Sequence, residues 1–456
     1  MHESSPRLVL AVFLLSVIVT ACAGGEGSDP ITPPEDRTSA AICGEDFGDV
    51  AGAWADYSPG VTIAVCGSGC DAATIEDGVA LGCDGTSGDV DVVVAPGIYD
   101  EALYLACPGA RLRLRSAAPA SSGEALAALP EGDRVVLDGA YLAADACAEE
   151  EHGALQLEAA RAVWIEGLEL RGYRRACAKG TAYGVVVQGD GGGLEAVRVR
   201  ANYIHDLGVA CVGGAATCDG DLNGHGVLVI GVEDQPIRAV EVANNLLAGL
   251  SLGQSEALAL NGHVERFAVT GNVIRDVDNI GIDVIGFEND LPWQAREGVV
   301  RDNVVEGLRC GNPTYASDTD NDPCPAGPGR WPAAAGIYLD GAHGVCVVGN
   351  RVRGFDRGLE VASERGGGDR QASAIALCNN RLEASREHAL TYGGSCDGGS
   401  NGARDVRVFG NTTVCPSGAA ACREIDRDPT CTTPLACTAG AGCDGPAPDG
   451  ELLDCP

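Results

Sequence analysis

The sequence predicts an all-β solenoid, a coil in which short strands stack turn upon turn. A motif of Asn, any residue and then an aliphatic residue or Thr begins at Asn202, Asn245, Asn272, Asn303, Asn350, Asn380 and Asn411. The gaps between these positions are 43, 27, 31, 47, 30 and 31 residues. Such a base period indicates one supersecondary unit that is repeated and stacked on itself.

A second repeated element supports the coil. Gly followed by alternating aliphatic residues begins 14 to 22 residues before an Asn motif, at Gly184, Gly226, Gly281, Gly336 and Gly358. Alternation of this kind is typical of strands. Aromatic residues make up only 4% of the chain, and Gly is abundant at 65 residues. Small and β-branched side chains must therefore build the interior, which suits thin layers of strands.

The charge balance narrows the choice of partners. The formal net charge is −34, and Lys179 is the only lysine. Phosphate backbones need a basic face, so nucleic acid is excluded as an expected partner. Polyanionic glycans would be repelled unless a divalent cation bridges them. The acidity is otherwise explained by solubility outside the cell.

The amino terminus reads as an export signal. Arg7 precedes a short apolar stretch, residues 8–19, which is too short to span a bilayer. It ends in Val19-Thr20-Ala21-Cys22, which resembles the lipobox of bacterial lipoproteins. This resemblance implies cleavage before Cys22, a lipid on its thiol, and an outer-membrane or cell-surface location. An ordinary secretory signal is the alternative. Residues 22–42 are rich in Gly and Pro and are expected to form a flexible tether.

The cysteine count agrees with export. The chain has 21 Cys, so lipidation of Cys22 leaves an even 20. Disulfides are the default state in an oxidising compartment. Spacing suggests four close pairs, which are Cys66/Cys70, Cys211/Cys218, Cys310/Cys324 and Cys415/Cys422. We expect the folded domain to cover residues 43–430, and a Cys-rich cap to cover residues 431–456.

The order of elements points to a known family. Thr74 precedes a short helix with Ile75 and Val79 on one face, and this helix is expected to cap the open end of the coil. Strands follow in the segments 91–99, 111–115, 135–139 and 163–167. From about 70 to 415 the chain resembles the right-handed parallel β-helix proteins of the pectin-lyase-like superfamily. That resemblance implies that the repeated Asn residues form a structural ladder of amide hydrogen bonds.

Acidic residues mark the first candidate site. In the Gly-aliphatic register Asp283 and Glu360 occupy the third position and Asp340 the fifth, and these positions share one side of a strand. Clustered carboxylates bind Ca²⁺ or divide into acid and base for glycoside cleavage. We therefore take Asp283, Asp340 and Glu360 as catalytic candidates, with Glu288 and Glu364 as substrate contacts. A solvated acidic face, or buried and paired carboxyls, is the alternative.

Two long gaps in the Asn repeat are expected to hold loops on the binding face. The second contains Asp318, Asp320 and Asp322, whose alternate spacing resembles a calcium loop without its central Gly and distal Glu. Ca²⁺ is therefore the one expected cofactor, and a plain acidic loop is the alternative. Trp293 and Trp331 flank this segment and could stack on sugar rings or simply pack in loops.

Two further patterns resemble catalytic motifs without completing them. Gly224-His225-Gly226 is similar to a polygalacturonase segment whose acidic partners are missing, and Val163-Trp164-Ile165-Glu166 is similar to a pectate lyase segment with two substitutions. Lys179 could be a lyase base but is more typical of a surface residue.

The sequence therefore favours a monomeric surface lipoprotein that binds a glycan through the face that bears the loops. A polysaccharide lyase or hydrolase is the first alternative, and a purely structural role is the second.

Overall fold

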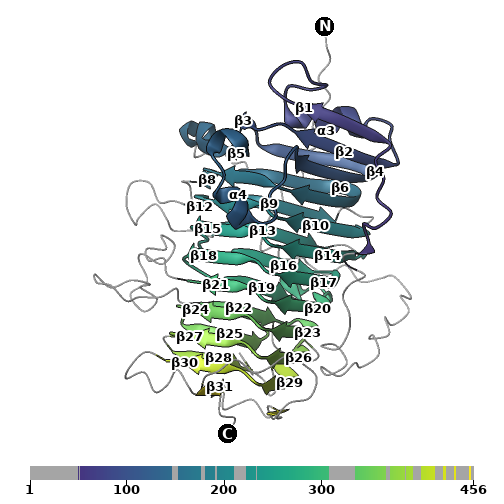
Figure 1. Ribbon diagram of the computed structural model, residues 1–456. Helices are drawn as coiled ribbons and strands as arrows, with labels where there is room; N and C mark the ends of the chain where they lie inside the picture. Colours follow the sequence, from purple (N-terminus) through teal and green to yellow (C-terminus); the bar gives the residue numbers. More distant parts are fainter. Residues whose placement is uncertain are drawn as a thin grey trace, which may run out of the picture. The chain divides into compact units, whose positions relative to one another are not determined.

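The computed structural model describes residues 50, 52–145, 152–175, 180–189, 193–209, 222–232, 234–307, 334–365, 370–385, 387–393, 402–415, 425–427, 436–437 and 451–452. The chain divides into two compact units, Met1–Asp36 and Arg37–Pro456, and the described residues all belong to the second. They form a parallel β-helix, in which short strands stack rung upon rung (Figure 1). The fold class predicted from the repeats is confirmed.

Most turns of the coil contribute one strand to each of three faces. The first, termed the carboxylate face, consists of β9 (Gly180–Gly189), β13 (Leu222–Gly231), β16 (Leu258–Gly262), β19 (Ile282–Ile285), β22 (Ala335–Asp340), β25 (Arg357–Ala362), β28 (His388–Tyr392) and β31 (Ile425–Arg427).

The second, termed the arginine face, consists of β1 (Val61–Val65), β2 (Asp89–Val94), β10 (Ala196–Arg200), β14 (Ile237–Ala243), β17 (Val264–Thr270), β20 (Arg296–Arg301), β23 (His343–Val348), β26 (Ala372–Cys378), β29 (Ala403–Phe409) and β32 (Ala436–Cys437). Two long strands, β4 (Leu103–Ser116) and β6 (His152–Glu166), pair with each other along both faces. Because β6 then pairs with both β9 and β10, the two faces form one 20-stranded sheet.

The third face is an 11-stranded sheet of β3 (Gly97–Tyr99), β5 (Val135–Asp138), β7 (Leu168–Arg171), β11 (Tyr203–His205), β15 (Leu246–Leu250), β18 (Val273–Val277), β21 (Val304–Glu306), β24 (Arg351–Arg353), β27 (Arg381–Glu383), β30 (Thr412–Val414) and β33 (Glu451–Leu452). A small parallel pair joins β8 (Arg174–Arg175) and β12 (Gly208–Val209). Strand β33 pairs with β30 in the antiparallel sense. The remaining elements are α3 (Ile75–Cys83), α4 (Gly123–Ala127), η1 (Glu131–Asp133), η2 (Gly139–Asp145) and η4 (Glu288–Asp290).

The core is a stack of aliphatic side chains that point into the coil. On the carboxylate face, Leu258 pairs with Ile282, and Ile282 pairs with Ile337, and all three side chains are fully buried. On the arginine face Phe267 lies next to Gly298, where a Cβ would come within 2.2 Å of the Phe267 ring. A large ring on one rung therefore requires a residue without a side chain on the next, which is close packing between rungs.

The repeated Asn residues form the expected ladder. In each adjacent pair the side-chain amide of one Asn donates to the Oδ1 of the next, at 2.9 to 3.1 Å, from Asn202 through to Asn411. The backbone N–H of the earlier Asn donates to the same oxygen. Because these amides are buried, each missing partner would leave a polar group unsatisfied. The structural interpretation of the Asn motif is confirmed.

The residue before each ladder Asn adopts a left-handed conformation. These residues have φ between 53° and 69° and are Ala201, Asn244, Gly271, Asp302, Gly349, Asn379 and Gly410. Gly349 is one of three glycines at this position, and a Cβ there would lie 2.6 Å from Oδ1 of Asp302, so a larger residue would displace that side chain. The same sharp turn thus recurs on successive rungs and keeps the side chains in register.

The helix α3 closes the amino-terminal end of the coil, as predicted. Its N-cap Thr74 accepts a hydrogen bond from the N–H of Asp77 at 3.1 Å. Ile75 and Val79 are buried in the main core. A disulfide between Cys83 and Cys107 ties the helix to β4.

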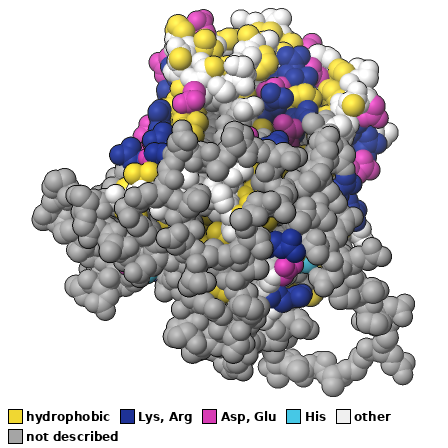
Figure 2. Space-filling view, turned by 60° about the horizontal axis from the view of Figure 1, so that its bottom comes forward, with side chains coloured by type: hydrophobic (Ala, Val, Ile, Leu, Met, Phe, Trp, Pro, Cys, Tyr) yellow, Lys and Arg dark blue, Asp and Glu magenta, His cyan; other side chains and the backbone are white. Residues whose placement is uncertain are grey.

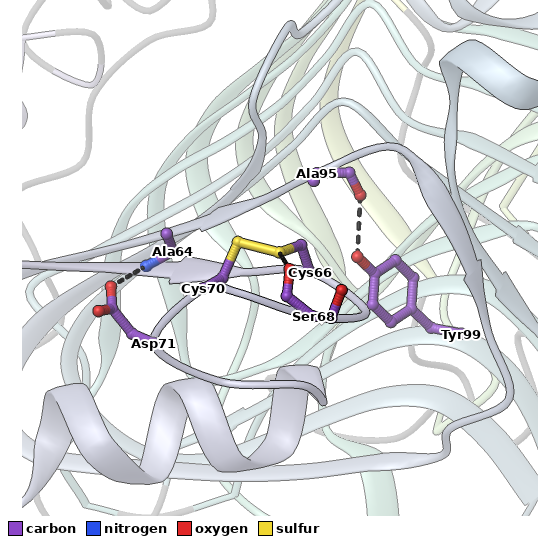
Figure 3. Close-up of a disulfide and its surroundings, with 7 residues drawn as sticks. All are labelled: Ala64, Cys66, Ser68, Cys70, Asp71, Ala95 and Tyr99. Atoms are coloured by element: carbon purple, nitrogen blue, oxygen red, sulfur yellow. Dashed lines mark hydrogen bonds between the residues drawn. A yellow bond between two sulfur atoms is a disulfide. The ribbon is translucent and has the colours of Figure 1, made fainter.

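The predicted Cys66–Cys70 disulfide closes the loop after β1 (Figure 3). Beside it the N–H of Ala64 donates to the Asp71 carboxylate at 2.8 Å. In the part of the chain that the structure describes, no helix is long and apolar enough to cross a membrane.

Candidate functional site

The carboxylate face places the predicted acidic residues in one column. Asp283 of β19 pairs with Tyr338 of β22, Tyr338 with Glu360 of β25, and Glu360 with Thr391 of β28. The neighbours of Asp283 in the strand, Ile282 and Val284, belong to the core. Since side chains alternate along a strand, this column points away from the core. The sequence left this orientation open, and the structure shows that it is outward.

An outward orientation does not make these side chains exposed. Asp283 is only 3% exposed, Tyr338 is 6% exposed and Glu360 is 8% exposed. Asp340, two positions along β22 from Tyr338, is 5% exposed. The expectation that outward carboxyls form a solvated face is therefore wrong, because the outer side of the sheet is covered at these rungs.

Asp283 is the most unusual residue of the site. Its Oδ1 is buried and has no hydrogen-bond partner in the structure. Burial raises the pKa of Asp283 well above its ordinary value, and the charges of Glu256, Asp340, Glu364 and Glu360 raise it further. Burial without an adjacent cation favours the protonated form of a carboxyl.

Asp340 and Glu364 form the second part of the site. The backbone N–H of Glu364 donates to Oδ1 of Asp340 at 2.7 Å. Burial raises the pKa of Asp340 well above its ordinary value despite this bond, and the charge of Glu364 adds to the effect. Glu364 is exposed, yet its partial desolvation raises its pKa as well. Asp340 is thus a buried member of the site, and Glu364 is an exposed one.

Glu360 has a different environment from Asp283. One terminal nitrogen of Arg357, Nη1, donates to both carboxylate oxygens of Glu360 at 2.9 Å. The Arg357 side chain is 40% exposed, whereas the Glu360 side chain is 10% exposed. An adjacent guanidinium favours the charged carboxylate. The column therefore holds an unpaired carboxyl and an ion-paired carboxylate, with Tyr338 between them.

The structure adds three residues that the sequence did not single out as part of this cluster. His225 of β13 lies with its Nδ1 3.3 Å from Oε2 of Glu256. Glu256 is one of the charges that act on Asp283. Thr391, below Glu360, is 7% exposed and its hydroxyl has no hydrogen-bond partner in the structure. The Gly-His-Gly motif could have pointed to His225, but the partner is a Glu that lies 31 residues further along the chain.

The other predicted contacts have mixed outcomes. Glu288 lies near the cluster, because its charge acts on Asp340 and Glu364, and Arg365 donates to it at 2.9 Å. The Trp293 ring stacks on His263 with a centroid separation of 4.3 Å. One face of the Trp293 indole is therefore occupied by the protein itself. Trp331, the proposed calcium ligands Asp318, Asp320 and Asp322, and the lipidation site Cys22 lie outside the described residues. Within the described ranges no cluster of three or more His, Cys, Asp or Glu side chains could hold a metal ion.

The motif around Trp164 has a structural explanation. Trp164 lies on the arginine face between the guanidinium groups of Arg113 and Arg198, whose carbons are 3.8 Å and 4.5 Å from its ring centroid. These cation–π contacts explain Trp164 as a residue that packs between two arginines. Lys179 lies outside the part of the chain that the structure describes.

Comparison with known proteins adds little beyond the fold. No protein-family model matches the chain. The uncharacterized protein YwoF of Bacillus subtilis strain 168 is 30% identical over 266 residues, which are 58% of this chain and 50% of that protein. The chain thus spans half the length of this curated relative.

Several solved structures are similar in arrangement. The catalytic unit of an α-1,3-glucanase from Streptomyces thermodiastaticus has a TM-score of 0.40 at 12% identity, covering 83% of this chain and 66% of that one. An alginate lyase from Paenibacillus has a TM-score of 0.41 at 11% identity, covering 84% and 98%. These likenesses say nothing about activity. By its own strand order and register, this chain is a parallel β-helix protein, the fold of the pectin-lyase-like superfamily that its sequence resembles.

Proposed function

We propose that this protein acts on a glycan at the carboxylate face, and that the reaction is hydrolysis of a glycosidic bond. One observation carries the proposal: a buried, unpartnered Asp283 shares a column with Glu360, whose carboxylate is held by Arg357. Two carboxyl groups in opposite environments are what glycoside hydrolysis requires. Glycan is the ligand class that the sequence analysis favours.

The roles follow from the two environments. Asp283 holds a proton and donates it to the glycosidic oxygen as the bond to the anomeric carbon breaks. A water molecule attacks that carbon, and its proton passes to the Glu360 carboxylate. Exchange of one proton with solvent at each carboxyl restores the starting state. Asp340 and Glu364 assist by keeping negative charge beside Asp283, which holds its pKa up.

The spacing of the column suggests a stereochemical outcome. Asp283 and Glu360 are two rungs apart, so their backbones are separated by roughly 10 Å. Inverting enzymes keep their carboxyls about 6.5–9.5 Å apart to leave room for a water molecule, whereas retaining enzymes bring them to about 5 Å. Tyr338 stands between the two carboxyls and prevents closer approach. We therefore expect inversion at the anomeric carbon.

Non-catalytic binding is the second candidate, and the burial of Asp283 favours it. A side chain that is 3% exposed offers little surface to a substrate, whereas Glu364 is exposed. The two candidates are separated by incubating the full chain with a panel of oligosaccharides, with and without EDTA. Shorter products that disappear in Asp283→Asn support hydrolysis. Affinity without any product supports binding.

We further propose that the protein is exported and held on a membrane by a lipid on Cys22. The proposal is supported by the lipobox-like sequence that ends at this residue. Labelling of cells with a radioactive or clickable palmitate is the test. Label on the wild-type chain, and none on Cys22→Ala, is the expected result.

A further inference from the structure

We propose that the carboxylate face binds a positively charged sugar unit, a hexosamine with a free amino group, in preference to a neutral sugar or a uronate. The inference rests on the proposed function, since it names the substrate class for the same site. It is carried by three carboxyls that form no ion pair with a described residue and by two buried polar atoms without hydrogen-bond partners.

The charge balance of the site is uneven. Five acidic residues act on one another around β16, β19, β22 and β25, and they are Glu256, Asp283, Asp340, Glu360 and Glu364. Among the described residues, Arg357 pairs with Glu360 and His225 lies against Glu256. Arg365 pairs with Glu288, although its charge also lowers the pKa of Glu364 and of Asp340. Within the described chain, Asp283, Asp340 and Glu364 form no ion pair. Among the described residues, this site therefore holds more carboxyl groups than cationic partners.

Two buried atoms show where a ligand would make contacts. Oδ1 of Asp283 and the hydroxyl of Thr391 both lack a hydrogen-bond partner, and both belong to the same outward column. Buried polar atoms are nearly always satisfied, so an exception needs a reason. An ammonium group has three donors and no acceptor. It would satisfy a carboxylate oxygen and neutralise its charge in a single contact.

The other sugar classes fit less well. A uronate would bring another negative charge to a site where several carboxyls already repel one another, and the cost is largest where water is excluded. A neutral sugar would satisfy hydrogen bonds but would leave the excess charge in place. The overall charge of −34 also attracts cationic polymers and repels polyuronates.

Binding of a cation here has a measurable proton signature. Burial raises the pKa of Asp340 and of Glu364 in the free protein, and a nearby ammonium group favours the charged form of both carboxyls. The protein therefore releases protons as the amino sugar binds. A neutral or anionic sugar gives no such release from these groups.

The experiment uses three sets of oligosaccharides of equal length: chitosan oligomers with free amines, chitin oligomers with acetylated amines, and oligogalacturonates. Calorimetric titration of the full chain in two buffers with different ionisation heats measures both affinity and proton release. We expect chitosan oligomers to bind at least tenfold more tightly than chitin oligomers, with proton release. Equal affinity for the two, or tighter binding of the uronate, overturns the inference but leaves the proposed function standing.

Matched variants separate this site from the general acidity of the surface. The double variant Asp283→Asn with Glu364→Gln should lose the preference for the amine and most of the proton release. The control is Glu195→Gln, on the other side of the coil, which removes an exposed carboxylate and should change neither. Retention of the preference in the double variant overturns the inference, because the charge of the whole surface would then explain it. If no glycan of any kind is bound or cleaved, the proposed function itself fails.

Discussion

The two outward faces of the 20-stranded sheet bury charged side chains in opposite ways. On the arginine face the buried carboxylates Asp89 and Asp91 have guanidinium partners: Arg111 donates to both oxygens of Asp89 at 2.6 Å, and Arg115 donates to Asp91 at 2.9 Å. On the carboxylate face Asp283 and Asp340 have no such partner among the described residues. Burial is similar in the two places, so the partners make the difference.

The contrast separates structure from function. A buried ion pair that is geometrically complete holds its strands together and offers nothing to a ligand. A buried carboxyl without a partner costs stability, and a protein keeps such a group where chemistry or binding uses it. In Figure 2 the basic and acidic side chains of the described surface are intermixed rather than segregated. The carboxylate face departs from that local balance.

Replacement of Asp283 by Asn should have the largest effect on activity. The amide cannot donate a proton to a leaving group, so hydrolysis should fall by about 10²–10⁴-fold. Initial rates on the best glycan substrate measure it. Unfolding in urea at neutral pH should show a variant at least as stable as the wild type, since a destabilising carboxyl is removed. A large loss of stability with unchanged specific activity would contradict the proposed role.

The matching change on the arginine face should act on stability instead. Replacement of Arg111 by Ala leaves Asp89 buried without its cation, which should cost about 3–5 kcal/mol in the free energy of unfolding. The rate per folded molecule should not change. Replacement of Arg301 by Ala is the control, because Arg301 and its partner Asp302 are both more than half exposed. This exposed pair should contribute no more than about 1 kcal/mol.

The two faces should respond to pH with opposite sign. Asp283 has a raised pKa when folded, so its cost appears as the pH rises through the ordinary carboxyl range and is complete above the folded pKa. The stability gained in Asp283→Asn should therefore be present at neutral pH and vanish in acid. Urea unfolding at a series of pH values measures the difference between the two proteins. A gain that persists below pH 3 would contradict the assignment.

The contribution of Glu265, on the arginine face, to stability should depend on pH in the opposite sense. Burial alone would raise its pKa, but the hydrogen bond from His263 and the charge of Arg296 lower it to about 2. Its contribution is present above the ordinary carboxyl pKa and is lost as the pH falls toward about 2. Glu265→Gln should thus be less stable than the wild type at neutral pH, and the gap should close in acid. The same unfolding series provides the measurement, and a constant gap would rule this out.

The smallest expected effect on activity is that of replacing the exposed Glu364. Glu364→Gln removes a charge that raises the pKa of both Asp283 and Asp340. The alkaline limb of the activity profile should move to lower pH by a fraction of a unit, with little change in the maximal rate. Rates across the pH range test this. No shift would indicate that Glu364 lies too far into solvent to act on the acid.

The sequence predicted the arrangement of the rungs, but it did not predict which charged side chains pair with one another. The Gly and Asn repeats predicted the coil, the ladder, and the shared column of Asp283 and Glu360, because the register of a solenoid repeats with the chain. The partner of Glu360, Arg357, is three residues away, yet nothing in the local pattern marked it. The approach of His225 to Glu256 was missed because it depends on which rungs stack. The Cys83–Cys107 bridge was missed because spacing along the chain does not reveal which strand a helix covers.

The sequence by itself determined that this chain winds into stacked rungs with Asp283 and Glu360 in one column, since periodicity alone sets which side chains alternate and align. Only the tertiary structure decided that these carboxyls point outward and are nevertheless buried. It also decided that Glu360 is ion-paired and that Asp283 is not. The reason is that burial and ion pairing arise between rungs far apart in the sequence, where neighbouring residues carry no record of the contact.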